Sequence, residues 1–419
     1  MLFAKECRKI SVSLVFWIYC IIIALMFFTQ YFSDCTEREY PPSPGAPAGD
    51  YDFKPSGDHD TIIEGTVNSL INDYYSNKYI CYPFGFYKAV HLKDKDQEKI
   101  EAYITEITGL DHDKLAEIKK NCEEYYVSDG VHEYKEYKAE HIDVDTDKIS
   151  YDRFREIISD IDSILGGGSD YAPESAEYNF SMIPMTYEDA LEEYNELFEK
   201  DGIAGAYARL FSDYLGITLG IMPVFVAIAL VSADRRSRMD QLIFSRNISS
   251  FRLVFTRYAA LITMMFIPVL IEIIASVIQL LVIYNGESVA VEKMLGIPVF
   301  WLLPNLMVSA ALGMLLTEVF SGGTAIVVQF AVWFMSIMRG GTVLSGNIRK
   351  FTLVCRHNTL YNRAQFMLHK NDFIFNRTFY FIASLAAVAV TAFVFEMKRG
   401  GRFNGIRLFG KGGILRRKA

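Results

Sequence analysis

The chain lacks the sequence motifs of the common hydrolases. Neither G-x-S-x-G nor H-E-x-x-H occurs among its 419 residues, and these are the motifs of α/β-hydrolases and zinc proteases. Its seven histidines and six cysteines show no zinc-ligand spacing. The segment from Asp143 begins like a calcium loop, but Lys148 and Phe154 replace the required Gly and Glu. We therefore expect no enzyme activity and no metal site.

A complete phosphate-binding loop is also missing. Residues 405–411 match G-x-x-x-x-G-K, but Gly412 stands where a Ser or Thr would hold the metal ion. The segment follows a long apolar run, so we interpret it as a basic tail at a membrane surface. We expect no cofactor in this chain, and any ATP hydrolysis must come from a partner.

Acidic residues are scarce outside a single segment. Residues 33–206 hold 40 of the 50 Asp and Glu, and the rest of the chain is strongly basic. A proline-rich linker opens this segment, and apolar residues at helical spacing follow. Three glycines at 166–168 should end a helix, and Thr186 with Asp189 forms a capping box that should begin another. The predicted buried helix faces are Ile62, Ile63, Val67, Leu70, Ile71 and Tyr74; Ile100, Tyr103, Ile104 and Ile107; and Phe154, Ile157, Ile158, Ile161 and Leu165.

Long apolar runs dominate the remainder of the chain, which is 51% hydrophobic overall. A helix needs roughly 20 apolar residues to cross the hydrocarbon of a bilayer. We predict an all-α polytopic membrane protein with a mostly helical extracytoplasmic domain between its first two helices. The six predicted transmembrane helices are 11–32, 210–232, 256–284, 296–318, 322–338 and 377–397.

The basic segments orient these helices. Short loops rich in Lys and Arg stay in the cytoplasm, whereas long domains cross largely regardless of charge. Residues 1–10, the link 233–255 and the tail 398–419 should therefore be cytoplasmic, with both termini inside. The acidic domain at 33–206 and the loop at 339–376 should lie outside, although the loop is also basic.

Four cysteines fall in the parts predicted to lie outside, where a disulfide can persist. A disulfide between Cys81 and Cys122 is possible because both belong to the acidic domain, and reduced buried thiols are the alternative.

Polar side chains within the predicted spans are candidate functional residues, because insertion there costs a few kcal/mol. They could line a translocation path or a dimer interface, or only hold the helices together. The residues are Glu272, Gln279, Asn305 and Gln329. For the three amides we favour a role in holding the helices together, and for Glu272 both interpretations stay open.

The link between the second and third spans carries an unusual density of charge. Residues 232–258 contain six arginines and two aspartates between two apolar runs. Met239, Leu242, Ile243 and Phe244 would lie on one side of a short helix, flanked by charged side chains. Such an amphipathic helix at the membrane surface would give a transmembrane subunit a docking site for a soluble motor protein.

This arrangement resembles the permeases of the ABC-2 family of ABC transporters, in the branch with a large external domain after the first span. In that family a cytoplasmic helix between spans two and three docks on the ATPase subunit. Gln241-Leu-Ile stands at the family's Glu-Leu-Leu position and Asn247-Ile-Ser at its Pro-x-Ser position. The Gly-Thr and the Pro of the pattern are absent, and Arg238-Met239 replaces the Gly-Thr.

The resemblance implies a multi-pass permease of the bacterial plasma membrane that exports a substrate. Its partners would be an ATPase subunit that binds ATP and magnesium, a second permease copy or a homologue, and the lipid bilayer, with no nucleic acid. It also implies short interfacial helices at 339–377, with the arginines of this loop at the outer lipid headgroups. The implied ATPase-coupling residues are Arg235, Arg236, Arg238, Asp240, Leu242, Ile243 and Arg246.

A membrane-anchored receptor is the alternative. Its external domain would bind a ligand and its spans would only signal. A permease requires a separately encoded ATPase, and a receptor does not. An integral-membrane enzyme ranks third because its chemistry needs clustered groups that this sequence lacks.

Overall fold

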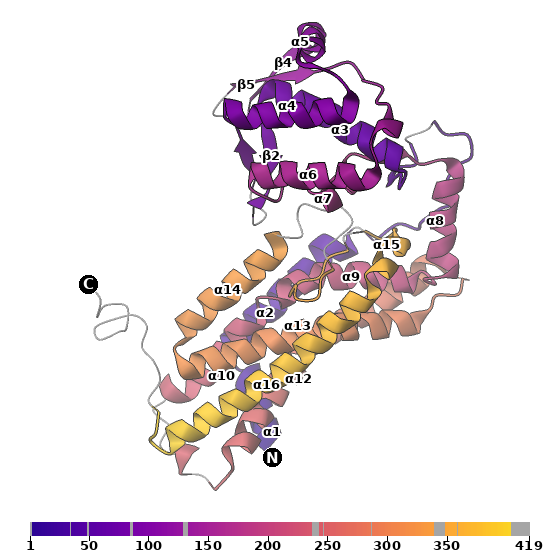
Figure 1. Ribbon diagram of the computed structural model, residues 1–419. Helices are drawn as coiled ribbons and strands as arrows, with labels where there is room; N and C mark the ends of the chain where they lie inside the picture. The colour runs from indigo at the N-terminus through magenta and orange to yellow at the C-terminus, as the bar shows by residue number, and fades with distance from the viewer. Residues whose placement is uncertain are drawn as a thin grey trace. The chain divides into compact units, whose positions relative to one another are not determined.

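The computed structural model describes residues 2–33, 35–47, 50–83, 87–128, 133–236, 243–245, 247–285, 287–338, 348–357 and 359–403. These residues are mainly helical (Figure 1). Their contacts divide the chain into two units. The acidic unit comprises Pro42–Leu191, and the helical unit comprises the described residues before and after it.

Three helices build the core of the acidic unit: α3 (His59–Ser76), α4 (Asp94–Thr108) and α6 (Tyr151–Leu165). The apolar faces predicted from helical spacing are confirmed, because all their members are buried except the half-buried Tyr74 and Tyr103. The shorter helices α5 (His112–Asn121) and α7 (Pro173–Asn179) complete the helical part of this unit.

The predicted helix ends of the acidic unit are confirmed. Helix α6 stops at Leu165 because Gly166, Gly167 and Gly168 all have positive φ angles, which favour glycine. The Thr186 backbone N–H donates to Asp189 Oδ2 (3.0 Å), and the Asp189 N–H donates back to Thr186 Oγ1 (3.2 Å). This reciprocal cap opens α8 (Tyr187–Glu199).

Short strands are the feature of the acidic unit that helical spacing did not predict. They form three antiparallel pairs whose registers place Phe53 opposite Pro184, Tyr79 opposite Val90, and Glu123 opposite Lys138. The strands of the first two pairs have three residues each, which is too short to show a period in the sequence, whereas those of the third pair have six. The pairs are β1 (Phe53–Pro55) with β6 (Met182–Pro184), β2 (Tyr79–Cys81) with β3 (Lys88–Val90), and β4 (Glu123–Ser128) with β5 (Glu133–Lys138).

All six cysteines are free thiols. Cys81 Sγ lies 3.8 Å from the Leu165 carbonyl oxygen, and Cys122 Sγ lies 3.3 Å from that of Ile118. The suggested disulfide is therefore not formed, and the structure has the alternative, reduced thiols. Burial raises the pKa of the Cys81 thiol to about 11, so this thiol is protonated and unreactive at neutral pH.

The helical unit is built from apolar helices and their short connections. Helix α2 continues as the π-helical turn η1, and α15 is a short helix before the last long one. The helices are α1 (Leu2–Ser11), α2 (Leu14–Met26), η1 (Phe27–Phe32), α9 (Ala204–Leu219), α10 (Pro223–Arg236), α12 (Ser250–Ile283), α13 (Val291–Val319), α14 (Gly322–Met338), α15 (Arg363–Leu368) and α16 (Lys370–Arg399).

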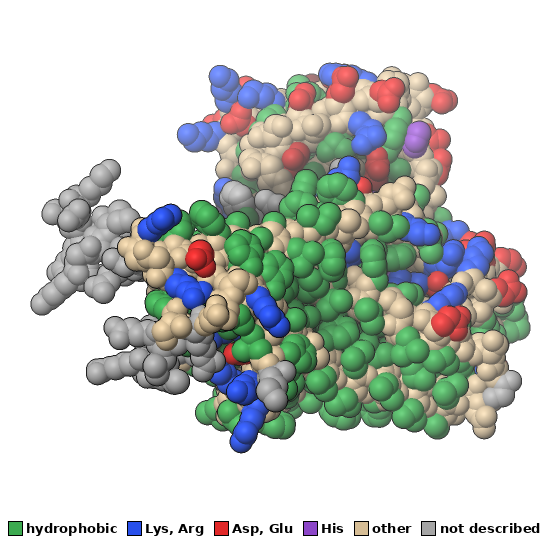
Figure 2. Space-filling view, turned by 90° about the horizontal axis from the view of Figure 1, so that it is seen from below, with side chains coloured by type: hydrophobic (Ala, Val, Ile, Leu, Met, Phe, Trp, Pro, Cys, Tyr) green, Lys and Arg blue, Asp and Glu red, His purple; other side chains and the backbone are tan. Residues whose placement is uncertain are grey.

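Four of these segments are long and apolar enough to cross a membrane: Leu14–Phe32, α12, α13 and α16. The pair α9 and α10, bent by 41° at its break, would be a fifth. Helix α14 has 17 residues and is therefore about 25 Å long, shorter than the ~30 Å hydrocarbon core. The chain is a multi-pass membrane protein by these criteria. Figure 2 shows hydrophobic side chains spread over a broad face of the helical unit.

The bend between α9 and α10 is held by polar side chains of two other helices. Pro223 opens α10 and has no N–H to donate. The nearby Gly220 carbonyl instead accepts hydrogen bonds from Ser309 Oγ (2.8 Å) and Gln329 Nε2 (2.6 Å). A Cβ at Gly220 would lie 2.8 Å from Val354 Cγ2, so a larger residue would not fit.

Replacing Gln329 by Leu should destabilise the bend. The Gly220 carbonyl would lose one of its two donors, which we expect to cost about 1 kcal/mol. The thermal midpoint of the full chain in detergent measures this loss, and Val327→Leu, at an exposed site on the same helix, is the control. An unchanged midpoint for Gln329→Leu would contradict this role.

Candidate functional site

The predicted ATPase-coupling residues belong to the connection between α10 and α12. Arg238, Asp240, Leu242 and Arg246 lie outside the described residues. Arg235 and Arg236 end helix α10 and are described only by their backbone. The remaining residue, Ile243, is buried and packs into the core of the helical unit.

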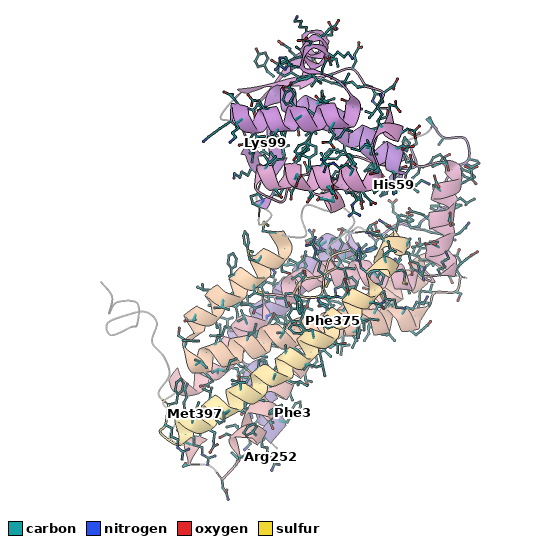
Figure 3. All side chains as sticks on the ribbon, viewed as in Figure 1. Phe3, His59, Lys99, Arg252, Phe375 and Met397 are labelled. Atoms are coloured by element: carbon teal, nitrogen blue, oxygen red, sulfur yellow. The ribbon has the colours of Figure 1, made fainter. Side chains whose placement is uncertain are left out.

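The described part of this link is bound to the C-terminal end of α16. Arg399 Nε donates to the Phe244 carbonyl (2.9 Å), and its Nη1 donates to the Ile248 carbonyl (2.7 Å). The Phe244 ring packs edge-on against Phe395, with ring centroids 5.5 Å apart. Figure 3 places Met397 of α16, Arg252 of α12 and Phe3 of α1 at this end of the unit. We name it the link end.

Charged pairs with little exposure to solvent join the other helices at the link end. Glu6 of α1 is 2% exposed, and its Oε2 lies 3.6 Å from Arg257 Nε of α12. Glu318 of α13 accepts a hydrogen bond from Lys398 Nζ of α16 at 2.7 Å. Sequence inspection did not single out these four residues. They stand where apolar runs meet the basic segments, which is the signal that could have identified them.

A second charged cluster lies toward the opposite end of the helical unit, on α9 and the residues just before it. Two carboxylates from this region bind the loop that precedes α16. Asp201 accepts from Arg209 Nη2 (2.7 Å) and from Arg363 Nε (3.1 Å). Asp213 accepts from Arg356 Nε (2.8 Å) and from the His357 backbone N–H (2.7 Å). We name these residues the loop anchor: Asp201, Arg209, Asp213, Arg356, His357 and Arg363.

Arg377 of α16 extends this anchor toward α13. Its side chain is fully buried, with Nη1 3.0 Å from the Trp301 carbonyl and 2.6 Å from Asn305 Oδ1. Nη2 donates to the Leu353 carbonyl in the loop (3.1 Å). Among the described residues no carboxylate pairs with Arg377, and the acceptors that they offer its charge are neutral. Such a charge is stable in the interior only with many hydrogen bonds.

The arginines at 339–377 were expected at lipid headgroups, and three of them are instead bound within the protein. Arg356 and Arg363 pair with carboxylates, and Arg377 binds carbonyl and amide oxygens. Acids near the second span, Asp201 and Asp213, made this possible, and sequence inspection missed both. The sequence did contain a signal for them, because a charged side chain inside or beside an apolar run is costly and therefore needs a partner.

The four polar span residues contact different parts of the helical unit. Asn305 binds Arg377, Gln329 binds the bend at Gly220, and Gln279 Nε2 donates to the Cys35 carbonyl (2.7 Å) beyond η1. Each of the three amides thus donates or accepts a hydrogen bond within the helical unit. Glu272 is 6% exposed, and its Oε2 has no hydrogen-bond partner among the described residues.

One group of possible metal ligands occurs in the described part of the acidic unit. Atoms of Glu64, His141 and Asp143 lie within 4.8 Å of one another. His141 Nε2 already binds Glu64 Oε1 at 2.8 Å, and the histidine and Asp143 are exposed. A solvated surface pair accounts for this geometry without a metal ion.

Comparison with known proteins adds no assignment. No family model matches the chain. No curated protein and no solved structure matches it either.

Removing the Asp213 carboxylate should release the loop from α9. The Asp213→Ala change removes one acceptor of Arg356 and the acceptor of the His357 N–H. We expect this to cost about 3 kcal/mol, since Asp213 is fully buried. The free energy of unfolding in detergent and limited proteolysis of residues 348–362 would report the loss. Asp372→Ala is the control, because its ion pair with Lys350 is exposed and worth under about 1 kcal/mol. Equal effects of the two changes would contradict the anchor.

The loop anchor should weaken in acid through His357. Burial, with the Arg209 charge second, lowers the pKa of His357 to about 4. Its Nε2 faces the Tyr361 carbonyl (3.0 Å) and therefore carries the proton. Its Nδ1 has no hydrogen-bond partner among the described residues, so a second proton would be buried unbonded.

Protonation of His357 therefore favours the unfolded chain, where the pKa is near 6.5. The contribution of neutral His357 to the free energy of unfolding is fully present above about pH 6.5 and is lost as the pH falls toward 4. The thermal midpoint of His357→Gln should fall less over this interval than that of the unchanged chain. His369→Gln is the control, and parallel pH profiles for all three proteins would refute the prediction.

Proposed function

We propose that this chain is the permease subunit of an ABC-type exporter, which couples ATP hydrolysis by a separate ATPase subunit to export of a substrate. The observation that carries the proposal is the attachment of the basic link to the end of α16 through Arg399, Phe244 and Ile248. A link that transmits force must be fixed to a helix that spans the unit. A loop without such contacts would bend under the force and would not transmit it.

Helices α13 and α16 offer a path for that force. They run in the same direction, since Trp301 meets Arg377 in their first halves and Glu318 meets Lys398 near their ends. Helix α16 has 30 residues and is therefore about 45 Å long. A displacement of the link would thus move both helices together and reach the loop anchor at their other end.

In this proposal six helices cross the membrane, with α14 and the bent pair α9–α10 included. Both termini and the link lie in the cytoplasm, and the acidic unit lies outside. An ATPase subunit that binds ATP and magnesium docks on residues 235–249. A second copy of this chain, or a homologous permease, completes the pathway.

Charge reversal in the link tests the docking role. The triple change Arg235→Glu, Arg236→Glu and Arg238→Glu should reduce co-purification of an ATPase encoded beside this chain at least tenfold, while the chain still inserts. Reversal of Arg402, Arg407 and Lys411 in the tail is the matched control, because the total charge change is equal. Undiminished ATPase binding by the link variant would overturn the proposal, as would labelling of the link from the outside.

A further inference from the structure

A groove lined by α13 and α16 lies on the helical unit. It consists of two adjoining cavities of about 620 and 650 Å³ that share Gly296 and Phe300. A Cβ placed on Gly296 would meet no atom within 4 Å, so this glycine opens directly into the groove. Each cavity lies within the size range of small-molecule sites, ~300–1,000 Å³.

The first cavity is basic, because five Lys or Arg and one acid line it. The acid, Asp201, already shares its carboxylate between Arg209 and Arg363. Lys293 Nζ is held at this end by the carbonyls of Lys200 (2.9 Å) and Asp201 (3.0 Å), not by a carboxylate. Lys370 has no ion-pair partner among the described residues. The cavity therefore keeps a net positive charge after its own ion pairs are formed.

The second cavity is apolar, with Leu295, Val299, Leu303 and Phe381 in its walls. Its polar lining includes Arg377, whose buried charge has only neutral acceptors among the described residues. Glu292 is an exposed acid at its rim. The groove thus joins a site for an anion to a site for a hydrocarbon chain.

We propose that this groove binds an anionic phospholipid. Its phosphate lies between Lys293 and Lys370, and an acyl chain follows Val299, Leu303 and Phe381 toward the middle of the helices. Both lysines stand at the starts of apolar helices, where the headgroups of a bilayer are expected, and basic side chains attract anionic lipids there. Buried Arg209, with its Nε unpaired among the described residues, adds positive charge behind the phosphate.

Charge argues against a second copy of the chain as the occupant. In a symmetric dimer centred on this groove, the same basic residues would face one another. Like charges across an interface are unfavourable. This inference does not depend on the proposed export function, since a receptor with the same groove would bind the same lipid.

Lipid binding to the full chain tests the inference. Native mass spectrometry in neutral detergent would compare phosphatidylglycerol, phosphatidylcholine with the same acyl chains, and free glycerol phosphate. We expect phosphatidylglycerol to bind about tenfold more tightly than phosphatidylcholine, with no detectable binding of glycerol phosphate. Lys370→Gln should lower this preference several-fold, and Gly296→Leu, which fills the groove, should lower the binding of both lipids.

The controls place the same changes elsewhere on the helical unit. Lys350→Gln removes an exposed lysine outside the groove, and Gly323→Leu adds a leucine at an exposed helix glycine. Neither should alter lipid binding. Equal binding of the two phospholipids, undiminished binding by Gly296→Leu, or binding of glycerol phosphate as tight as that of the lipid would each overturn the proposal. So would a dimer that Gly296→Leu dissociates, because a second copy would then cover the groove.

Discussion

Buried charge before and within α9 determines how this end of the helical unit is built. Two carboxylates, Asp201 and Asp213, lie in a region with little water, and each needs donors to offset the loss of hydration. The loop before α16 supplies these donors through Arg356, Arg363 and the His357 N–H. A loop that would otherwise be free is thus part of the core.

The same requirement couples distant parts of the chain. Arg377 must satisfy its donors where it is buried, and it does so with acceptors from α13 and from the loop. At the link end, Lys398 and Arg399 bind α13 and the link. Helices α13 and α16 are therefore fixed to each other at both ends. In the proposed permease these contacts would transmit movement along the two helices, which also line the groove.

Apolar patterning had a different role in each unit. In the acidic unit, one-sided helix faces such as Ile157, Ile158 and Ile161 pack together and form a core that excludes water. In the helical unit, many large apolar side chains remain exposed, among them Ile271, Ile278 and Phe393. Such exposure is expected where lipid is the solvent, because the hydrocarbon tails are as apolar as the side chains.

The sequence by itself determined the helices, their apolar faces, their caps and the uneven distribution of charge, since these depend on residues close together in the chain. It could not show that Asp213 would meet Arg356, or Asn305 Arg377, because these partners are 143 and 72 residues apart. It likewise could not distinguish an arginine facing lipid headgroups from one buried among carbonyls. Only the packing of the helices places the partners within hydrogen-bonding distance and decides which charges leave water.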